Sequence, residues 1–153
     1  MTHFTTTLPL SLSKKAILAS LNVTEAVNLY HASYLLKQKD NEKEPLYVVF
    51  CATHSDQGWT NYPHIPGQEY LYESNDNTAL ITSKVAYEIR KKEARRLVFL
   101  KNPNSDTHSH DYKFLGIYEF DEDYDYMKEK RFRYKLIATE YPLLPDAESD
   151  LAA

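Results

Sequence analysis

The chain has 153 residues and a formal net charge of −4, so it is long enough for one domain with a buried core but lacks the overall basic charge that is typical of nucleic-acid-binding proteins. Its one cysteine, Cys51, excludes an internal disulfide, and no apolar run approaches the roughly 20 residues of a membrane span. No signal peptide is evident, because the apolar stretch at 8–10 is too short. We therefore expect a cytoplasmic protein with a single domain over 1–153, whose ends at 1–12 and 142–153 are flexible.

The first part of the chain predicts one or two helices. Ser13 is suited to cap a short helix over 14–21, in which apolar side chains recur on one face. Those side chains are Ile17, Leu18 and Leu21. Residues 22–37 predict a second helix, because apolar residues recur there at three- and four-residue spacing, although an extended conformation also suits this composition.

From Leu46 onward the pattern changes to strands. Residues 46–52 are almost continuously apolar, as expected for a strand near the middle of a sheet. Further strands are predicted at 69–73, 97–101 and 112–120. The last predicted strand, 131–139, alternates apolar with basic residues, which indicates one apolar and one basic face. Residues 53–68 predict a long loop, and residues 84–94 predict a short helix or an irregular arm.

The basic residues are concentrated in two segments. Residues 84–101 contain seven Lys or Arg and two Glu, and residues 128–135 contain five Lys or Arg and one Glu. A local basic face that binds phosphate is therefore compatible with a negative net charge. The predicted phosphate ligands are Arg90, Arg95, Arg96, Arg131 and Arg133. A charge run of this kind is also typical of an ordinary solvated face.

Aromatic, amide and acidic residues follow one another between 59 and 77. Aromatic rings stack on nucleobases for about 1–3 kcal/mol each, and a carboxylate can accept a hydrogen bond from the amino group of cytosine. We therefore predict a pocket that binds a base flipped out of the nucleic acid. Its predicted members are Trp59, Tyr70, Tyr72, Asp76 and Asn77. The alternative is that Tyr70 and Tyr72 belong to the core and that residues 75–77 form a turn.

Several kinds of catalytic site are excluded by simple count. The chain has only three glycines, which excludes a phosphate-binding P-loop, a dinucleotide-binding glycine motif and a hydrolase nucleophile elbow. His108 and His110, flanked by aspartates, leave open a small metal-dependent hydrolase. The acidic segment 119–125 and the many tyrosines leave open a protein-interaction module, or a regulator that mimics nucleic-acid charge. We assign no catalytic residue, no metal ligand and no cofactor.

Four short segments occur in an order that resembles a known family. The segment 77–80 (Asn-Thr-Ala-Leu) precedes the basic strand 96–102, the Gly-Ile-Tyr segment 116–118 and the strand 132–137. This order resembles the SRA (SET-and-RING-associated) domains of the PUA-like superfamily, over residues 46–140. The resemblance implies an α+β fold with N-terminal helices packed on a twisted, partly closed PUA/SRA-like β-barrel. It also implies a non-catalytic DNA-binding module that recognises a modified base in a defence or restriction context.

A second resemblance concerns the predicted first helix. Residues 12–21 are similar to the helix that opens an uncharacterised domain at the C-terminus of bacterial helicase-nuclease defence proteins. This resemblance implies that a nuclease or helicase acts on a separate chain. We expect DNA rather than RNA as the nucleic-acid partner, and no membrane.

Overall fold

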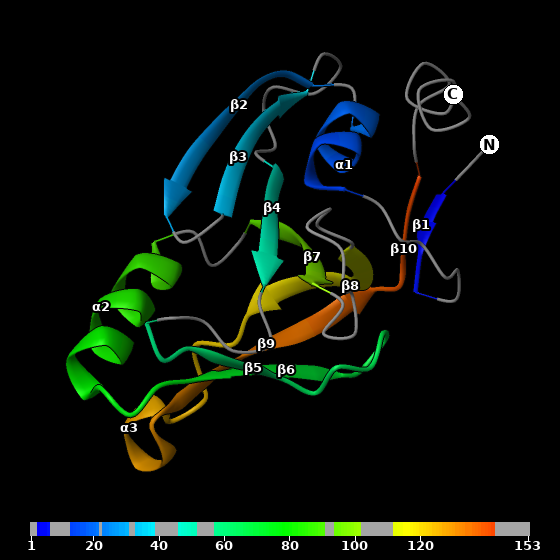
Figure 1. Cartoon of the computed structure of the whole chain (residues 1–153). Helices are drawn as coiled ribbons and strands as arrows, with labels where there is room; N and C mark the ends of the chain where they lie inside the picture. Colours follow the sequence, from blue (N-terminus) through cyan, green and yellow to red (C-terminus); the bar gives the residue numbers. More distant parts are fainter. Residues whose placement is uncertain are drawn as a thin grey trace.

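The computed structural model describes residues 3–6, 13–21, 23–30, 33–38, 46–51, 57–90, 94–101 and 112–142. Its helices are α1 (Lys14–Ser20), α2 (Thr78–Ile89) and α3 (Tyr126–Glu129). The strands are β1 (His3–Thr5), β2 (Val23–Tyr30), β3 (Ser33–Gln38), β4 (Leu46–Cys51), β5 (Thr60–Tyr62), β6 (Tyr70–Ser74), β7 (Arg95–Lys101), β8 (Tyr112–Phe120), β9 (Arg131–Ala138) and β10 (Glu140–Pro142). Figure 1 shows how these elements are arranged.

Eight of the strands form one strongly curved sheet in the order β2-β3-β4-β7-β8-β9-β6-β5. All neighbours are antiparallel except β4 and β7, which run parallel. Figure 1 shows β2, β3 and β4 running steeply, whereas β5, β6 and β9 run across the lower part of the molecule. Among the described residues the edge strands β2 and β5 do not pair, so the sheet is open and the predicted barrel is wrong. Closure requires the strands of both edges to meet in a fixed register, which this sheet does not provide.

The predicted first helix is confirmed, and the second is wrong. Ser13 caps α1 by accepting a hydrogen bond from the backbone N–H of Ala16 at 3.1 Å. A helix, with an extended alternative, was predicted for residues 22–37, whereas residues 23–30 and 33–38 form the antiparallel pair β2 and β3. β-Branched and aromatic residues favour strands, and pairing of β3 with β4 extends the sheet, so this long-range pairing overrides the helical spacing of the apolar residues.

The other predicted strands are confirmed to within two residues at each end. Residues 84–94, predicted as a short helix or an irregular arm, include the second half of α2, which starts at Thr78 and ends at Ile89. Residues 3–5, expected to belong to a flexible end, form β1 and pair with β10. Residues 102–111, which include His108 and His110, lie outside the described residues. None of the helices that the structure describes is both long and apolar enough to span a bilayer.

Both faces of the sheet at β7 are buried. On one face, α1 and the β1–β10 pair cover an aromatic core in which Phe4 contacts Phe99 with ring centroids 5.2 Å apart. In β7, Leu97 and Phe99 point into this core, whereas Val98 and Leu100 point to the opposite face. Because both faces are covered, β7 is apolar at successive positions instead of alternating, which explains its continuous apolar run.

A glycine allows the sharp bend of β8. The register between β7 and β8 shifts next to Gly116, whose φ of +141° lies in a region that side-chain-bearing residues rarely adopt. A Cβ at this position would lie 2.7 Å from Leu136 Cδ1 and 3.2 Å from the carbonyl oxygen of Ala138. The curvature of the sheet therefore depends on the absence of a side chain here.

We expect Gly116→Ala to lower the free energy of unfolding by about 1–3 kcal/mol, because the new methyl group is strained and crowded. Urea denaturation followed by circular dichroism measures this change. Lys135→Ala, at an exposed position of the neighbouring β9, serves as the control and should change the free energy by less than about 0.5 kcal/mol. An equal, small effect of both substitutions would show that the bend does not depend on Gly116.

Candidate functional site

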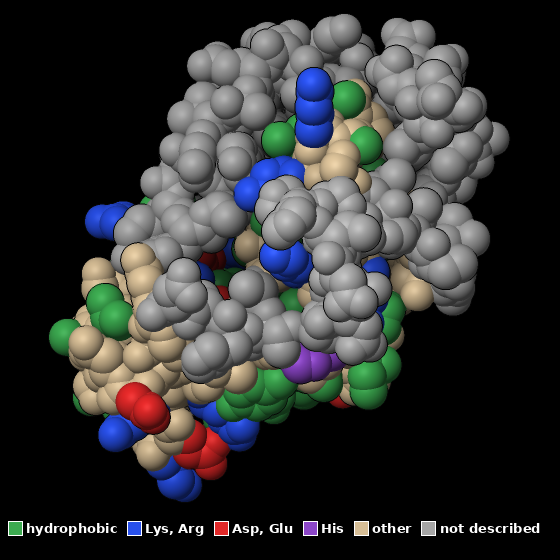
Figure 2. All heavy atoms as spheres, viewed as in Figure 1, with side chains coloured by type: hydrophobic (Ala, Val, Ile, Leu, Met, Phe, Trp, Pro, Cys, Tyr) green, Lys and Arg blue, Asp and Glu red, His purple; other side chains and the backbone are tan. Residues whose placement is uncertain are grey.

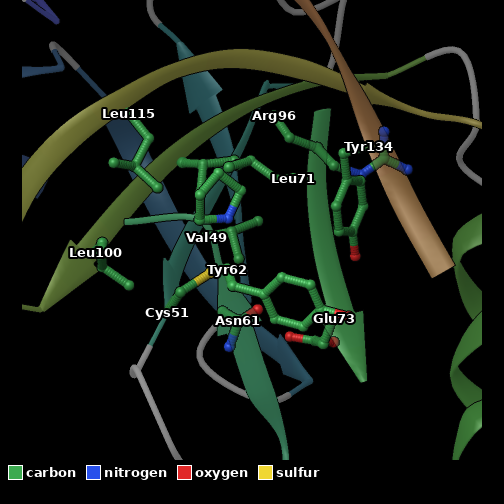
Figure 3. A pocket seen from close by; sticks show the side chains of 12 residues that line it. Val49, Cys51, Asn61, Tyr62, Leu71, Glu73, Arg96, Leu100, Leu115 and Tyr134 are labelled. Carbon is green, nitrogen blue, oxygen red and sulfur yellow. The ribbon is translucent and has the colours of Figure 1, made fainter. Parts of the chain in front are cut away.

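A pocket lies on the inner side of the curved sheet, between β4 and β7 on one side and β5, β6 and β9 on the other. Figure 3 shows Leu100 and Leu115 at one side of the pocket and Glu73 and Tyr134 at the other. Its apolar lining residues are Val49, Cys51, Pro63, Leu71, Val98, Leu100 and Leu115. Its polar lining residues are Asn61, Tyr62, Glu73, Arg96 and Tyr134. The pocket therefore combines an apolar wall with a small number of polar groups, as small-ligand sites do.

The strand period explains why these side chains meet. In β6, Leu71 and Glu73 point to the inner side, and the pairing of β5 with β6 places Asn61 directly opposite Glu73. Tyr134, from the paired strand β9, lies opposite Leu71. Consecutive inward positions of three neighbouring strands thus supply one wall of the pocket.

The carboxylate of Glu73 forms an ion pair with Lys84, which α2 directs toward the sheet. Both residues are almost fully buried, with 5% exposure for Glu73 and 7% for Lys84. Burial by itself lowers the pKa of Lys84, but attraction to Glu73 and the hydrogen bond to it outweigh this effect, so the pKa is raised. The Lys84 ammonium also lies 4.9 Å from the ring of Trp59. Lys84 therefore keeps its charge, and it is held between Glu73 and Trp59.

A second buried ion pair lies one helical turn further along α2. Glu88 accepts a hydrogen bond from Arg96 Nε at 2.9 Å, and Arg96 also donates to the carbonyl oxygen of Ala94 at 3.0 Å. Arg96 is 1% exposed and Glu88 is 3% exposed. The guanidinium lies 5.7 Å from the ring of Tyr134. Arg96 is thus engaged inside the protein, away from the surface at which a phosphate group would bind.

Two further titratable groups of the pocket keep their protons at neutral pH. Burial raises the pKa of the Cys51 thiol to about 12, and the negative charge of Glu73 adds to this effect. Burial also raises the pKa of Tyr134 well above its ordinary value, with a smaller contribution from the charge of Glu88. A protonated thiol is a poor nucleophile, so Cys51 contributes to the wall of the pocket and not to covalent chemistry.

The five residues predicted to bind a base do not line this pocket. Trp59 is buried beside Phe132, with ring centroids 6.0 Å apart. Tyr70 and Tyr72 lie on the face of β6 opposite to Leu71 and Glu73. Asp76 is exposed in the turn before α2, and the Asn77 side chain caps α2 by accepting from the N–H groups of residues 79 and 80. The sequence correctly predicted that side chains alternate along β6. It did not predict that Leu71 and Glu73, and not Tyr70 and Tyr72, lie on the pocket side.

The sequence reasoning missed Asn61, Glu73 and Tyr134. One signal was present, because Glu73 is an acidic residue on the side of β6 that also carries Leu71. An acid on an apolar strand face needs a buried partner, and such a residue is a better site candidate than the half-buried tyrosines. The partner, Lys84, could not be identified without the position of α2.

The opposite side of β5, β6 and β9 forms a second surface of tyrosines and arginines, which we name the outer face. Its members are Tyr62, Tyr70, Tyr72, Tyr124, Arg131 and Arg133. The Arg131 guanidinium lies 4.3 Å from the ring of Tyr72, and that of Arg133 lies 4.0 Å from the ring of Tyr70. Both arginines also pair with acids, Arg131 with Glu129 at 2.6 Å and Arg133 with Asp121 at 2.6 Å.

The outer face borders an open groove of about 510 Å³. The charged residues that line it are Glu119, Asp121, Glu122, Asp123, Arg133 and Lys135. Acidic residues outnumber basic ones in this groove, so the surface around Arg133 is not the cationic face that the sequence predicted for phosphate binding. Of the five arginines predicted to bind phosphate, Arg90 is exposed, Arg95, Arg131 and Arg133 are half-buried, and Arg96 is buried.

Within the part of the chain that the structure describes, no three His, Cys, Asp or Glu side chains are grouped so that they could hold a metal ion. His108 and His110 lie outside those residues. Figure 2 shows charged side-chain atoms deep in a hollow of the face that it presents.

Comparison with known protein families identifies this architecture. The model of the SET and RING associated domain matches residues 13–143. The chain belongs to the SRA family. The predicted resemblance to SRA domains is thus confirmed, and the match extends further toward the N-terminus than the segments that suggested it. The resemblance of residues 12–21 to helicase-nuclease defence proteins stays a prediction.

A solved structure supports the same fold. The SRA domain is similar to the 5-hydroxymethylcytosine-specific restriction enzyme AbaSI, with a TM-score of 0.56 and 14% sequence identity. The similarity covers 86% of this chain and 39% of that enzyme. No curated protein sequence matches the chain. At this identity the similarity shows a shared fold and leaves the function to be argued from the site.

We expect Arg96→Met to lower the free energy of unfolding of this SRA domain by about 3–5 kcal/mol, because it leaves Glu88 buried without its partner. Arg90→Met, at an exposed position, is the matched control and should change it by less than about 0.5 kcal/mol. The double variant Arg96→Met with Glu88→Leu should be more stable than Arg96→Met alone, since no unpaired charge remains. Chemical denaturation of the four proteins, wild type included, measures these differences. A stable Arg96→Met variant would contradict the structural role of the pair.

Proposed function

We propose that this SRA domain binds DNA and accepts a modified cytosine, flipped out of the duplex, in the pocket on the inner side of the sheet. The observation that carries the proposal is the pairing of an apolar wall with one buried carboxylate, Glu73. A flipped base is read by stacking and by hydrogen bonds to its edge. Tyr134 offers a ring for stacking, and Glu73 can accept a hydrogen bond from the exocyclic amino group of cytosine. We therefore assign reading of the amino group to Glu73, in place of Asp76, which the sequence predicted for it.

The apolar wall suits the modified side of the base. Val98, Leu100 and Leu115 offer no hydrogen-bonding side-chain group, so a carbon substituent on the base ring can contact them without leaving a polar atom unpaired. The polar edge of the base, with its exocyclic amino group, would face Glu73 on the other side of the pocket. This division of the lining orients a base without any contact from the rest of the duplex.

The pocket must widen to accept a base. Its cavity volume between the described residues is about 20 Å³, which is room for one water molecule and not for a pyrimidine ring. Tyr62 stands at the edge strand β5 and stacks on Tyr72 of the outer face, with ring centroids 5.5 Å apart. A three-residue edge strand is bonded to one neighbour, so we propose that β5 and Tyr62 move to open the pocket.

The fold comparison supports this proposal. The similar structure is a restriction enzyme described as specific for 5-hydroxymethylcytosine, and this chain corresponds to 39% of its length. We propose that this domain supplies base recognition in a restriction or defence context, and that DNA cleavage or unwinding belongs to a separate chain. The domain itself is proposed to be non-catalytic and to need no cofactor. Arg90 and Arg95, which flank the segment between α2 and β7, are the proposed phosphate contacts.

We expect Cys51→Phe to abolish the preference for modified DNA, because the larger ring fills the pocket. Fluorescence anisotropy should compare a duplex that contains one 5-methylcytosine or 5-hydroxymethylcytosine with the same unmodified duplex. For the wild type we expect at least tenfold tighter binding of one modified duplex, and for Cys51→Phe a ratio near one with unmodified DNA bound as before. Ile137→Phe, which adds the same ring at an exposed position of β9, should keep the wild-type ratio. A wild type that binds no duplex at low salt would refute the proposed function.

The outer face favours a second candidate function, docking of a protein partner. Tyrosine and arginine are enriched in protein interfaces and in their energetically dominant contacts. The rings and guanidinium groups are held rigidly by the cation–π contacts and ion pairs of Arg131 and Arg133, which lowers the entropic cost of binding. The neighbouring groove, with its excess of carboxylates, fits a partner segment that carries arginine or lysine.

For this candidate we expect a fluorescein-labelled octapeptide of alternating arginine and glycine to bind, and its glutamate counterpart not to bind. Glu119→Gln with Asp123→Asn should weaken binding at least fivefold, because it removes two negative charges from the groove. Asp76→Asn with Glu140→Gln removes the same charge at exposed positions elsewhere and serves as the control. Equal weakening by both pairs would indicate attraction by net charge alone and would exclude the groove.

A further inference from the structure

The buried pair of Glu73 and Lys84 has a consequence for the kind of base that the pocket can accept. Lys84 lies on the buried face of α2 together with Ile81, Val85 and Glu88, so its position is set by packing of the whole helix. Its ammonium bonds Oε1 of Glu73, and the same carboxylate lines the pocket. The cation therefore acts on the one acidic group that a bound base would meet.

The proton state of a carboxyl group decides which base edge it can bind. An ionised carboxylate only accepts hydrogen bonds, whereas a protonated carboxyl group also donates one. Cytosine carries an amino group, a donor, at the position where thymine carries a carbonyl oxygen, an acceptor. An ionised Glu73 thus favours cytosine and its derivatives, and a protonated Glu73 would also accept thymine.

The groups around Glu73 leave Lys84 as its direct counter-charge. Titratable or charged groups lie around it on β4 (Cys51), β7 (Arg96), β9 (Tyr134) and α2 (Lys84 and Glu88). On β5, Tyr62 also lines the pocket, but its ring stacks on Tyr72 of the outer face. Arg96 is bonded to Glu88, and Cys51 and Tyr134 stay neutral. Without Lys84, the carboxylate would be buried beside neutral groups and the neighbouring acid Glu88, an environment that favours the protonated form.

We propose that Lys84 is a positioning residue for specificity: by pairing with the Glu73 carboxylate and fixing its orientation, it makes the pocket accept cytosine-type bases and reject thymine-type bases. The inference rests on the proposed function, because it requires that a flipped base enters this pocket. It goes further by assigning the discrimination to a side chain that has no contact with the base.

The sharpest test compares 5-methylcytosine with thymine, which carry the same methyl group at the same ring position and differ at the edge that Glu73 would read. Each base is placed opposite an abasic site in the same duplex, so that both leave the helix at a similar cost. An otherwise identical duplex with two facing abasic sites gives the affinity for DNA without a base. Anisotropy measures all three affinities between pH 6 and pH 8.5.

For the wild type we expect at least tenfold tighter binding of 5-methylcytosine than of thymine at every pH in this range. For Lys84→Met we expect a ratio near or below one at pH 6 that rises with pH, because the uncompensated carboxyl group is protonated at low pH and ionises as pH rises. A merely structural role of Lys84 would weaken both bases together and would give no pH-dependent ratio. That result, or an unchanged tenfold ratio in Lys84→Met, would overturn the proposal.

Glu73→Gln provides an independent measurement if Lys84→Met does not fold, as judged by circular dichroism and thermal melting. A side-chain amide both donates and accepts, so we expect this variant to lose the discrimination between the two bases at all pH values. Retention of the tenfold ratio by Glu73→Gln would overturn the proposal. The two proposals fail differently: if the wild type binds neither base more tightly than the abasic duplex, the base pocket itself is refuted, whereas binding of both bases with equal affinity refutes only the role of Lys84.

Discussion

Two buried ion pairs connect α2 to opposite sides of the pocket, and the geometry of the site depends on them. Lys84 pairs with Glu73 on β6, and Glu88, one turn later, pairs with Arg96 on β7. In the sheet β6 and β7 are separated by β8 and β9, so α2 bridges the curve of the sheet. A charge buried in an apolar interior is strongly unfavourable without its partner. The helix therefore holds the two sides of the pocket at a set distance.

The curvature of the sheet gives its two faces different roles. The side covered by α1 and the β1–β10 pair is a closed aromatic core. The inner side of β4, β7 and β8 meets that of β9, β6 and β5 around a small cavity, because the irregularity at Gly116 bends β8. Alternation along β6 and β9 then sends one set of residues to the pocket and the other set to the outer face. A single strand thus contributes to two surfaces of unlike chemistry.

Local sequence patterns predicted most of the strands and the first helix, but not the site. Residues 77–80 were recognised as similar to an SRA segment, and Asn77 was interpreted as a reader of the base, whereas in the structure it caps α2. The helical spacing of apolar residues in 22–37 was compatible with a strand as well, and pairing with β4 decided the outcome. Tyr70 and Tyr72 were attractive because they are aromatic, yet the inward positions of β6 belong to Leu71 and Glu73.

The amino-acid sequence by itself determined the strands β4, β6, β7, β8 and β9, the cap of α1, the alternation in β9 and membership of the SRA family, because these depend on local spacing and residue type. Only the tertiary structure decided which side of each strand faces the pocket. It also decided the two ion pairs, Lys84 with Glu73 and Arg96 with Glu88. Eleven residues separate Lys84 from Glu73 and eight separate Arg96 from Glu88, and each distance in space depends on how α2 packs across the sheet. The sequence contains many acidic and basic residues that could pair. The packing of α2 on the sheet selects these two ion pairs, because it buries their side chains next to each other.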